Sequence, residues 1–314
     1  MRLGATALLT VARAAAFAVL VPLAAYPWAA AAQQPAAGTP QTPGPAASGA
    51  PGPATQGASP VQAPGRGRGP QPIDPRVQVR THRFAETNED IPYALFVSSK
   101  VRKDQKAPMI VTLHGLGGTH TTMMRPNAID LAEAGGYILL SPMGYNPRGW
   151  YGAPAPQGRG GRRGAAPGTP AGVSDPPNLR ELSERETLQV IDLVRKEFTV
   201  DDARTYLMGH SMGGAGTLYL AIKYPERWAA AVAIAPAAFA VDTEGLSRIP
   251  RMPLMVVHGD MDTVVPPAVG RAWVEAMKAL KMNYQFIEVP GGDHGTVISS
   301  HQAEIFAFFA KHAR

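Results

Sequence analysis

The chain has 314 residues, no cysteine and a formal net charge of +6. Without cysteine it can form neither a disulfide nor a thiolate site, so an apolar core must stabilise any folded part. The length suits one large domain or two small ones.

The positive charge lies in two segments of low complexity. Residues 1–72 hold four arginines and no acidic residue, and residues 153–177 hold three arginines and one aspartate. These two segments account for the whole excess of positive charge, so the rest of the chain is neutral. A basic face on a folded domain would favour nucleic acid. Because the excess lies outside the patterned sequence, we expect no nucleic-acid partner.

The first 72 residues are not typical of a folded domain. Residues 1–32 start with Arg2, continue as an apolar run and end in small residues, which predicts a signal peptide and a secreted or periplasmic protein. No second apolar stretch is long enough to cross a bilayer, so we expect no stable membrane span after cleavage. Residues 33–72 hold ten prolines and eight glycines, which predicts a disordered linker.

From residue 78 onward, short apolar runs alternate with helical patterns. The strands expected in chain order are 78–84, 92–99, 108–115, 137–144, 205–211, 229–236, 253–259 and 283–291. The helices expected between and after them are 121–136, 179–198, 213–225, 268–281 and 301–313, the second with an apolar stripe of Leu188, Ile191, Leu193 and Val194. Such alternation predicts an α/β fold with a mostly parallel sheet and helices on both faces.

A second low-complexity segment interrupts this pattern. Residues 153–177 hold six prolines and six glycines, between the strand that ends near Gly144 and the helix that begins near Leu182. Two interpretations stay open for this insertion. It is either a disordered loop or a basic flap, carrying Arg159, Arg162 and Arg163, that attracts anionic substrates.

The segment "TYLMGHSMGGAGTLYLA" runs from strand-like sequence through Gly209-His210-Ser211-Met212-Gly213 into a helical pattern. The match to G-x-S-x-G is weak alone and gains weight from a strand before it and a helix after it. Such a turn presents the serine hydroxyl above the sheet. The glycines relieve crowding against the neighbouring elements, and the helix N-terminus favours developing negative charge.

A serine hydroxyl needs a base within hydrogen-bond reach and a third group to orient that base. "VVHGDMDTVVP" places carboxylates just after one buried strand, and "EVPGGDHGTV" places His294 just after another. In open α/β sheets, sites form at this carboxyl edge. The chain order serine, acid, histidine therefore predicts one site at that edge.

The motifs "LHGLGG", "GHSMGG", "HGDMDTVVP" and "GGDH", in this order, resemble those of the α/β-hydrolase family over residues 78–314. Within that family the chain looks like secreted prolyl-oligopeptidase-type and polyhydroxyalkanoate-depolymerase or feruloyl-esterase-like serine hydrolases. The resemblance implies Ser211 as nucleophile, His294 as general base and Asp262 as the orienting acid. It also implies an oxyanion hole from the backbone N–H groups of Leu116 and Met212.

Several other polar residues lie inside these motifs. Asp260 is an alternative to Asp262, whereas Asp293 adjoins His294 in sequence and is a poor candidate for orienting it. His210 and His258 are expected to be structural. No group of residues has the spacing of metal ligands, so we expect neither a metal nor a cofactor.

The segment "SPMGYNPRGWYG" follows a strand and is expected at the catalytic rim. Trp150 and Tyr151 are therefore candidate substrate-binding residues, although they could instead pack the loop against the body. The leading prediction is a secreted serine hydrolase that cleaves carboxylic esters, polymeric ones included, through an acyl-enzyme. The alternatives are a serine peptidase of prolyl-oligopeptidase type and a non-catalytic binding protein. The sequence predicts neither the acyl and alcohol groups nor the oligomeric state.

Overall fold

A computed structural model of the chain describes residues 73–156 and 175–314. The predicted signal peptide (1–32), the predicted linker (33–72) and most of the insertion at 153–177 lie outside the described residues. Their boundaries therefore stay predictions. The elements described below begin at Gln78, the residue at which the predicted catalytic domain starts.

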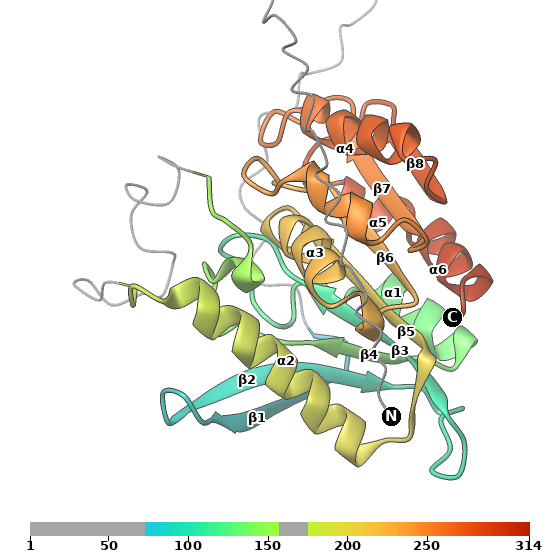
Figure 1. Cartoon of the computed structure of the whole chain (residues 1–314). Coiled ribbons are helices and arrows are strands. Elements are labelled where there is room, and N and C mark those ends of the chain that lie inside the picture. Colours follow the sequence, from blue (N-terminus) through green and yellow to red (C-terminus); the bar gives the residue numbers. More distant parts are fainter. Residues whose placement is uncertain (1–72, 157–174) are drawn as a thin grey trace, which may run out of the picture. The chain divides into compact units, whose positions relative to one another are not determined.

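The described residues form an eight-stranded mixed sheet with the order β1-β2-β4-β3-β5-β6-β7-β8 (Figure 1). The strands are β1 (Gln78–Phe84), β2 (Glu89–Val97), β3 (Ala107–Leu113), β4 (Ile138–Ser141), β5 (Val200–His210), β6 (Ala230–Ile234), β7 (Leu254–Gly259) and β8 (Tyr284–Val289). β2 pairs antiparallel with both β1 and β4, and all other pairs are parallel. The central strands β3, β4 and β6 are wholly buried because helices cover both faces of the sheet.

The helices divide between the two faces of the sheet. The α-helices are α1 (Pro126–Gly135), α2 (Leu179–Glu197), α3 (Met212–Lys223), α4 (Pro267–Ala279), α5 (Val297–Ser300) and α6 (Gln302–Lys311). Residues of α2, α3 and α4 share one apolar core with the sheet, and residues of α1, α5 and α6 share the other. Three 3₁₀ turns, η1 (Trp150–Gly152), η2 (Pro225–Arg227) and η3 (Thr243–Arg248), lie in the connections.

This architecture confirms the predicted α/β fold, and the structure departs from the predicted elements in detail. β5 starts at Val200, five residues before its expected start, because Val200 pairs with Ala107 at the beginning of β3. The apolar stripe predicted for α2 was wrong at Leu193, whose side chain is exposed, whereas Ile191 and Val194 are buried. α5 and the 3₁₀ turns were not predicted, since elements this short carry no periodicity.

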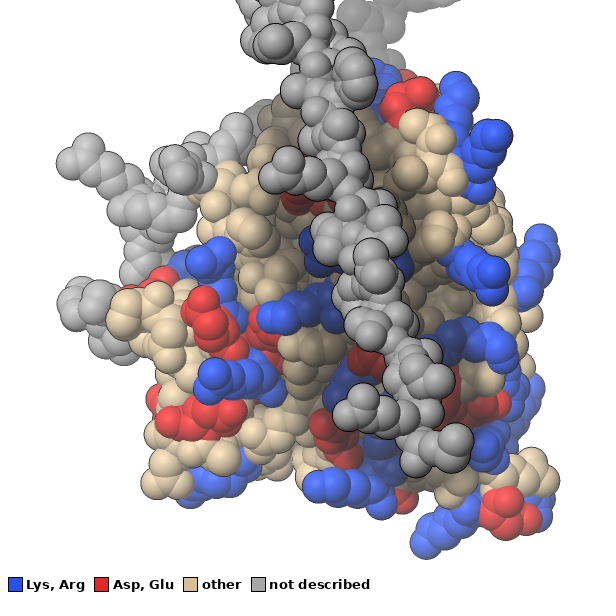
Figure 2. Space-filling view, in the orientation of Figure 1, with Lys and Arg blue, Asp and Glu red and all other residues tan. Residues whose placement is uncertain are grey.

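Charged side chains of both signs share the surface around α2 (Figure 2). Several join this helix to its neighbours, as in the ion pairs Arg80–Glu197, Arg227–Asp192 and Arg195–Asp202. Within the described ranges, no helix has both the length and the apolar character needed to cross a membrane.

Candidate active site

Ser211 lies in the turn between the end of β5 and the start of α3. Its backbone has φ 57° and ψ −116°, a conformation that a residue with a side chain adopts only under strain. A Cβ built on Gly209 would approach the carbonyl oxygen of Gly213 to 2.3 Å, and one on Gly213 would approach that of Leu113 to 2.2 Å. Only glycine fits at these two positions, which allows the helix to begin directly against β3 and β5.

Asp262 and His294 lie within hydrogen-bond distance of each other, although 32 residues separate them in sequence. Asp262 follows β7, and His294 follows the neighbouring strand β8. The Asp262 Oδ2 atom is 2.7 Å from the His294 Nδ1 atom. Asp262 is buried, whereas the His294 side chain keeps 17% of its surface exposed. This pair has the geometry of an orienting carboxylate and a histidine base that substrate can reach.

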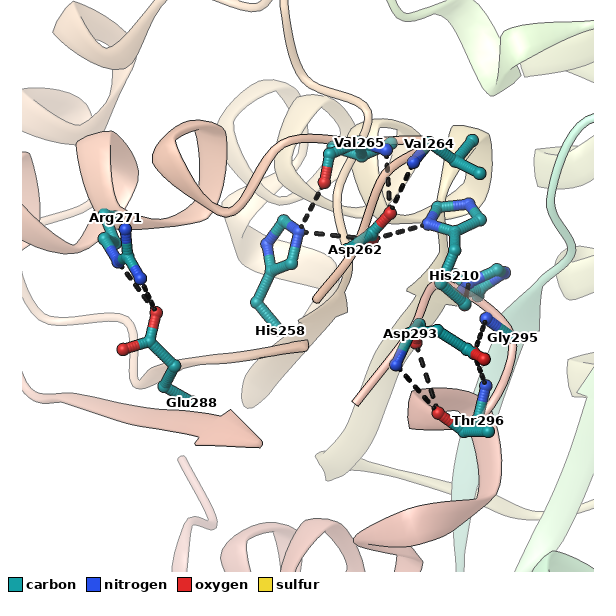
Figure 3. Close-up of polar contacts among 11 residues, drawn as sticks. His210, His258, Asp262, Val264, Val265, Arg271, Glu288, Asp293, Gly295 and Thr296 are labelled. Atoms are coloured by element: carbon teal, nitrogen blue, oxygen red, sulfur yellow. Dashed lines mark hydrogen bonds and ion pairs between the residues drawn. The ribbon is translucent and has the colours of Figure 1, made fainter. Parts of the chain in front are cut away.

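The carboxylate of Asp262 is held on both of its oxygens (Figure 3). Its Oδ1 atom accepts hydrogen bonds of 2.9 Å from the backbone N–H groups of Val264 and Val265. The buried Nε2 atom of His258 lies 3.4 Å from Oδ2 and donates to the Val265 carbonyl at 3.0 Å. These contacts fix the orientation of the carboxylate toward His294.

The two alternative carboxylates have other partners. The Asp260 Oδ1 atom accepts from the Gly291 N–H at 2.7 Å, which links the β7 loop to the β8 loop. The Asp293 Oδ1 atom accepts from the N–H groups of Gly295 and Thr296, and these bonds lower the pKa of its carboxyl. Neither carboxylate has a hydrogen bond to the His294 ring among the described residues.

The nucleophile candidate is close to the histidine through its sequence neighbour. The His210 ring centroid lies 4.6 Å from that of His294, and the His210 Nε2 atom is 2.7 Å from the His294 carbonyl oxygen. No hydrogen bond joins Ser211 Oγ to His294 within the described residues. Such contacts often form only when substrate binds, so the arrangement is compatible with base catalysis.

The loop after β3 faces the serine from the other side. A Cβ built on Gly115 would lie 3.3 Å from the Ser211 Cβ, so this backbone passes directly beside the nucleophile. Gly117 and Gly118 donate their N–H groups to Pro147 and Gly115, whereas the Leu116 N–H has no partner in the described part of the chain. Met212 is the first residue of α3, and its N–H has no acceptor within the helix.

The structure places Tyr151 in the core, not on an exposed pocket wall. Its side chain is fully buried, and its hydroxyl accepts from the His114 N–H at 3.0 Å. Both ring nitrogens of His114 lie 2.9 Å from carbonyl oxygens, those of Gly115 and Met143. Tyr151 thus supports the start of the loop after β3. Its burial differs from the exposed position that a substrate-binding residue would need. Trp150 is also packed in the core with 8% exposure, and substrate contact from it stays a prediction.

Helix α2 holds the loop that carries these aromatic residues, a role that sequence patterns did not indicate. The Glu186 Oε2 atom accepts from the N–H groups of Gly144 and Tyr145 at 2.8 and 3.2 Å, and Ser183 Oγ accepts from the Tyr151 N–H at 3.0 Å. Glu186 is fully buried, and its burial raises the pKa of its carboxyl. A buried polar face on α2 was the available signal, because Ser183 and Glu186 are spaced as neighbours on one side of a helix.

The described residues contain no group of three or more histidine, aspartate or glutamate side chains placed to hold a metal ion. Asp262 and His294 instead contact each other directly, as described above. The Asp262–His294 contact and the Ser211 turn are compatible with nucleophilic attack by Ser211 and proton transfer through His294.

The mixed sheet with helices on both faces agrees with the solved structures that the chain resembles. Residues 176–312 match the phospholipase/carboxylesterase family. A solved thermostable esterase is 25% identical with a TM-score of 0.58, over 77% of this chain and 64% of that one. The chain has the α/β-hydrolase fold.

Two further relatives of this hydrolase are esterases. Feruloyl esterase B of Neurospora crassa is 28% identical over 152 residues, which are 47% of this chain and 45% of the relative. The hydrolase thus spans less than half the length of that curated relative. The ferulic acid esterase of Anaeromyces mucronatus is 17% identical with a TM-score of 0.57, over 75% of this chain and 90% of that one, and shows the shared fold. These matches are to esterases, and the chain shares the fold of the solved ones.

Proposed function

We propose that this hydrolase cleaves carboxylic esters by a serine mechanism. The observation that carries the proposal is the 2.7 Å contact between the buried Asp262 carboxylate and His294 Nδ1, beside the strained turn that presents Ser211. Because Nδ1 faces the carboxylate, the proton there is held, and Nε2 is free to accept the proton of Ser211.

The reaction then proceeds in two halves. Ser211 Oγ attacks the ester carbonyl while His294 takes its proton, and the resulting oxyanion accepts hydrogen bonds from the N–H groups of Leu116 and Met212. Collapse of this intermediate breaks the ester bond, and His294 gives its proton to the leaving alcohol. Water attacks the acyl-enzyme by the same route and releases the carboxylic acid and free Ser211.

The surface around the site favours esters with an apolar group. Leu116, Phe239, Met261 and Val264 form what we call the apolar rim, and they are 56%, 40%, 63% and 52% exposed. They lie on loops that follow β3 and β6, which flank β5 in the sheet, and β7, the next strand after β6. Large apolar side chains gathered on one exposed edge are typical of a contact surface. We expect this rim to contact an aliphatic or aromatic part of the ester.

A panel of p-nitrophenyl esters of rising acyl length, with a feruloyl ester and matched peptide nitroanilides, tests the proposal. We expect hydrolysis of the esters and little hydrolysis of the amides, because an amide is more stable in its ground state and its amine must be protonated as it leaves. Comparable kcat/KM on an amide and its matching ester would favour the peptidase. No turnover of any substrate and no labelling by a fluorophosphonate would favour a binding protein.

We also propose that the hydrolase acts outside the cytoplasm. This proposal is supported by the leader-like sequence of residues 1–32 alone. Expression of the full chain, fractionation of the cells and mass spectrometry of the mature N-terminus test it. A cytoplasmic product that keeps Met1 and Arg2 would contradict it.

A further inference from the structure

His210, the variable residue of the serine motif, has contacts that a packing role does not require. Its Nε2 atom lies 2.7 Å from the main-chain carbonyl oxygen of His294. Among the described residues it is the one donor to that carbonyl. The two rings are also in contact, with centroids 4.6 Å apart and planes tilted by 48°. His294 is therefore held at two points, its ring by Asp262 and its backbone by His210.

The anchor itself is rigid. His210 is the last residue of β5, where it pairs with Ile234 of β6, and only 6% of its surface is exposed. A Cβ built on Gly115 would lie 3.2 Å from the His210 Nδ1 atom, so the ring lies between the oxyanion loop and the His294 loop. Because His210 adjoins Ser211, its position and that of the serine are fixed by the same strand.

The protonation of His210 suits this contact. A carbonyl oxygen only accepts, so Nε2 must carry the proton. Burial and the neighbouring charge of His294 lower the pKa of His210 to about 4. The ring thus stays neutral near neutral pH and still donates through Nε2. Asp262 and Arg125 are the other charged groups that influence it, with opposite signs.

We propose that His210 is a positioning residue that sets the place of the His294 imidazole relative to Ser211. The hydrogen bond joins the nucleophile's strand directly to the backbone of the base, which otherwise lies on a separate loop after β8. This inference rests on the proposed serine mechanism. Loss of the bond would let the His294 loop move, and a displacement of about 1 Å at a catalytic group costs roughly 100-fold in rate.

Two substitutions separate donation from packing. His210→Gln keeps an N–H donor near the position of Nε2, whereas His210→Phe keeps a ring and removes the donor. His312→Phe is a matched control, because His312 Nδ1 donates to the Phe308 carbonyl at 2.8 Å and its ring packs 4.5 Å from that of Phe308. His312 also contacts Asn283, which precedes β8, so it lies at the opposite edge of the sheet.

We expect His210→Phe to lower kcat on a p-nitrophenyl ester by about 10–100-fold with KM within about twofold. His210→Gln should recover most of the rate, and His312→Phe should match the wild type. Wild-type kcat in His210→Phe, or equal losses in the Gln and Phe variants, would overturn the proposal.

A second measurement uses the wild-type protein alone, so it tests the proposal even if the variants fail to fold. Long-range ¹H–¹⁵N NMR of the wild-type protein should show His210 as the neutral Nε2–H tautomer from pH 5 to 8. An Nδ1–H tautomer, or a charged ring at pH 6, would overturn the proposal without any variant. If the wild type hydrolyses no ester and takes up no fluorophosphonate, the serine mechanism is wrong. The NMR result reports on His210 separately, so the two failures can be distinguished.

Discussion

The two ends of strands β6 and β7 differ in how their surroundings are built. At the carboxyl ends lie a strained serine, a buried carboxylate with four donors near it, and the exposed apolar rim. At the amino ends lies a hollow of about 410 Å³, lined by Trp228, Met252 and the arginines Arg248, Arg251 and Arg314, among others. The hollow carries positive charge, but none of its lining residues has the positive φ that marks a strained backbone.

This difference teaches which features indicate chemistry in this protein. Strain and buried polar groups lower stability, so they persist where the surrounding structure holds them for a purpose. The carboxyl edge contains both, and the hollow contains neither. We therefore assign the chemistry to the edge with strain and polar contacts, although a hollow lies at the other. Each prediction below changes one side of this comparison.

The largest effect is expected at the strained serine. Ser211→Ala should lower kcat by roughly 10⁴–10⁶ with little change in stability, because the nucleophile is lost and the turn is kept. Ester hydrolysis and fluorophosphonate labelling followed by peptide mapping measure this. Labelling at another serine, or retained activity, would remove the catalytic assignment from the carboxyl edge.

The next effect separates the two carboxylates after β7. Asp262→Asn should lower kcat by about 10⁴, because the amide no longer provides a charged acceptor for His294 Nδ1. Asp260→Asn is the matched control and should change kcat by less than about tenfold, since the Asp260 carboxylate accepts from the Gly291 N–H and has no bond to His294 among the described residues. Steady-state kinetics on one ester compares them, and the opposite ranking would transfer the role to Asp260.

These two predictions depend on how much of the site the sequence could indicate. Runs such as 108–115 and 253–259 predicted buried strands, and their chain order placed Ser211, Asp262 and His294 at one edge, because parallel strands bring their carboxyl ends together. The sequence favoured Asp262 over Asp260 only through resemblance. The contact with His294 depends on the path of two loops, which local pattern does not specify.

The supporting contacts were harder to predict for a related reason. Tyr151 looked like a pocket residue because it follows a strand at the catalytic edge. Its positive φ of 53° turns it inward, and nothing in the letters "RGWYG" indicates that turn. The partner of His210 is 84 residues away in sequence, so its contact with His294 could be found only in three dimensions.

Stability at acidic pH gives a further test at the carboxyl edge. The folded protein holds the pKa of His210 at about 4, below an ordinary value near 6.5, because of burial and the charge of His294. Between these two pH values the unfolded chain binds more protons, so the free energy of unfolding should fall as the pH falls. The contribution is on the order of 3 kcal/mol. Urea unfolding at several pH values measures the free energy of unfolding of the wild type and of His210→Gln. The slope of this free energy against pH should differ most between the two proteins across this range. Equal slopes would contradict the prediction.

A smaller effect is expected at the support of the oxyanion loop. Tyr151→Phe leaves the buried His114 N–H without its acceptor, which costs about 1–3 kcal/mol of stability. We expect kcat to fall by several-fold as the loop loosens. Tyr145→Phe is the control, since its hydroxyl bonds the exposed Glu89 side chain. Thermal unfolding and ester kinetics measure both, and equal stabilities of the two variants would show that the buried bond is not a support.

The smallest effect is expected at the hollow. Arg248 and Arg251 are exposed and have no ionic partner among the described residues, and they lie at the amino ends of the strands that carry the site at their other ends. Neither contacts a residue assigned to catalysis. Replacing both with glutamine should therefore leave kcat and KM on a neutral ester within about twofold, since their charges are screened beyond roughly 8 Å at physiological salt. The experiment compares the double variant with Arg204→Gln, a surface arginine that pairs with Asp201. A loss of kcat of tenfold or more in the double variant alone would connect the hollow to the chemistry. It would contradict the assignment of the chemistry to the carboxyl edge alone.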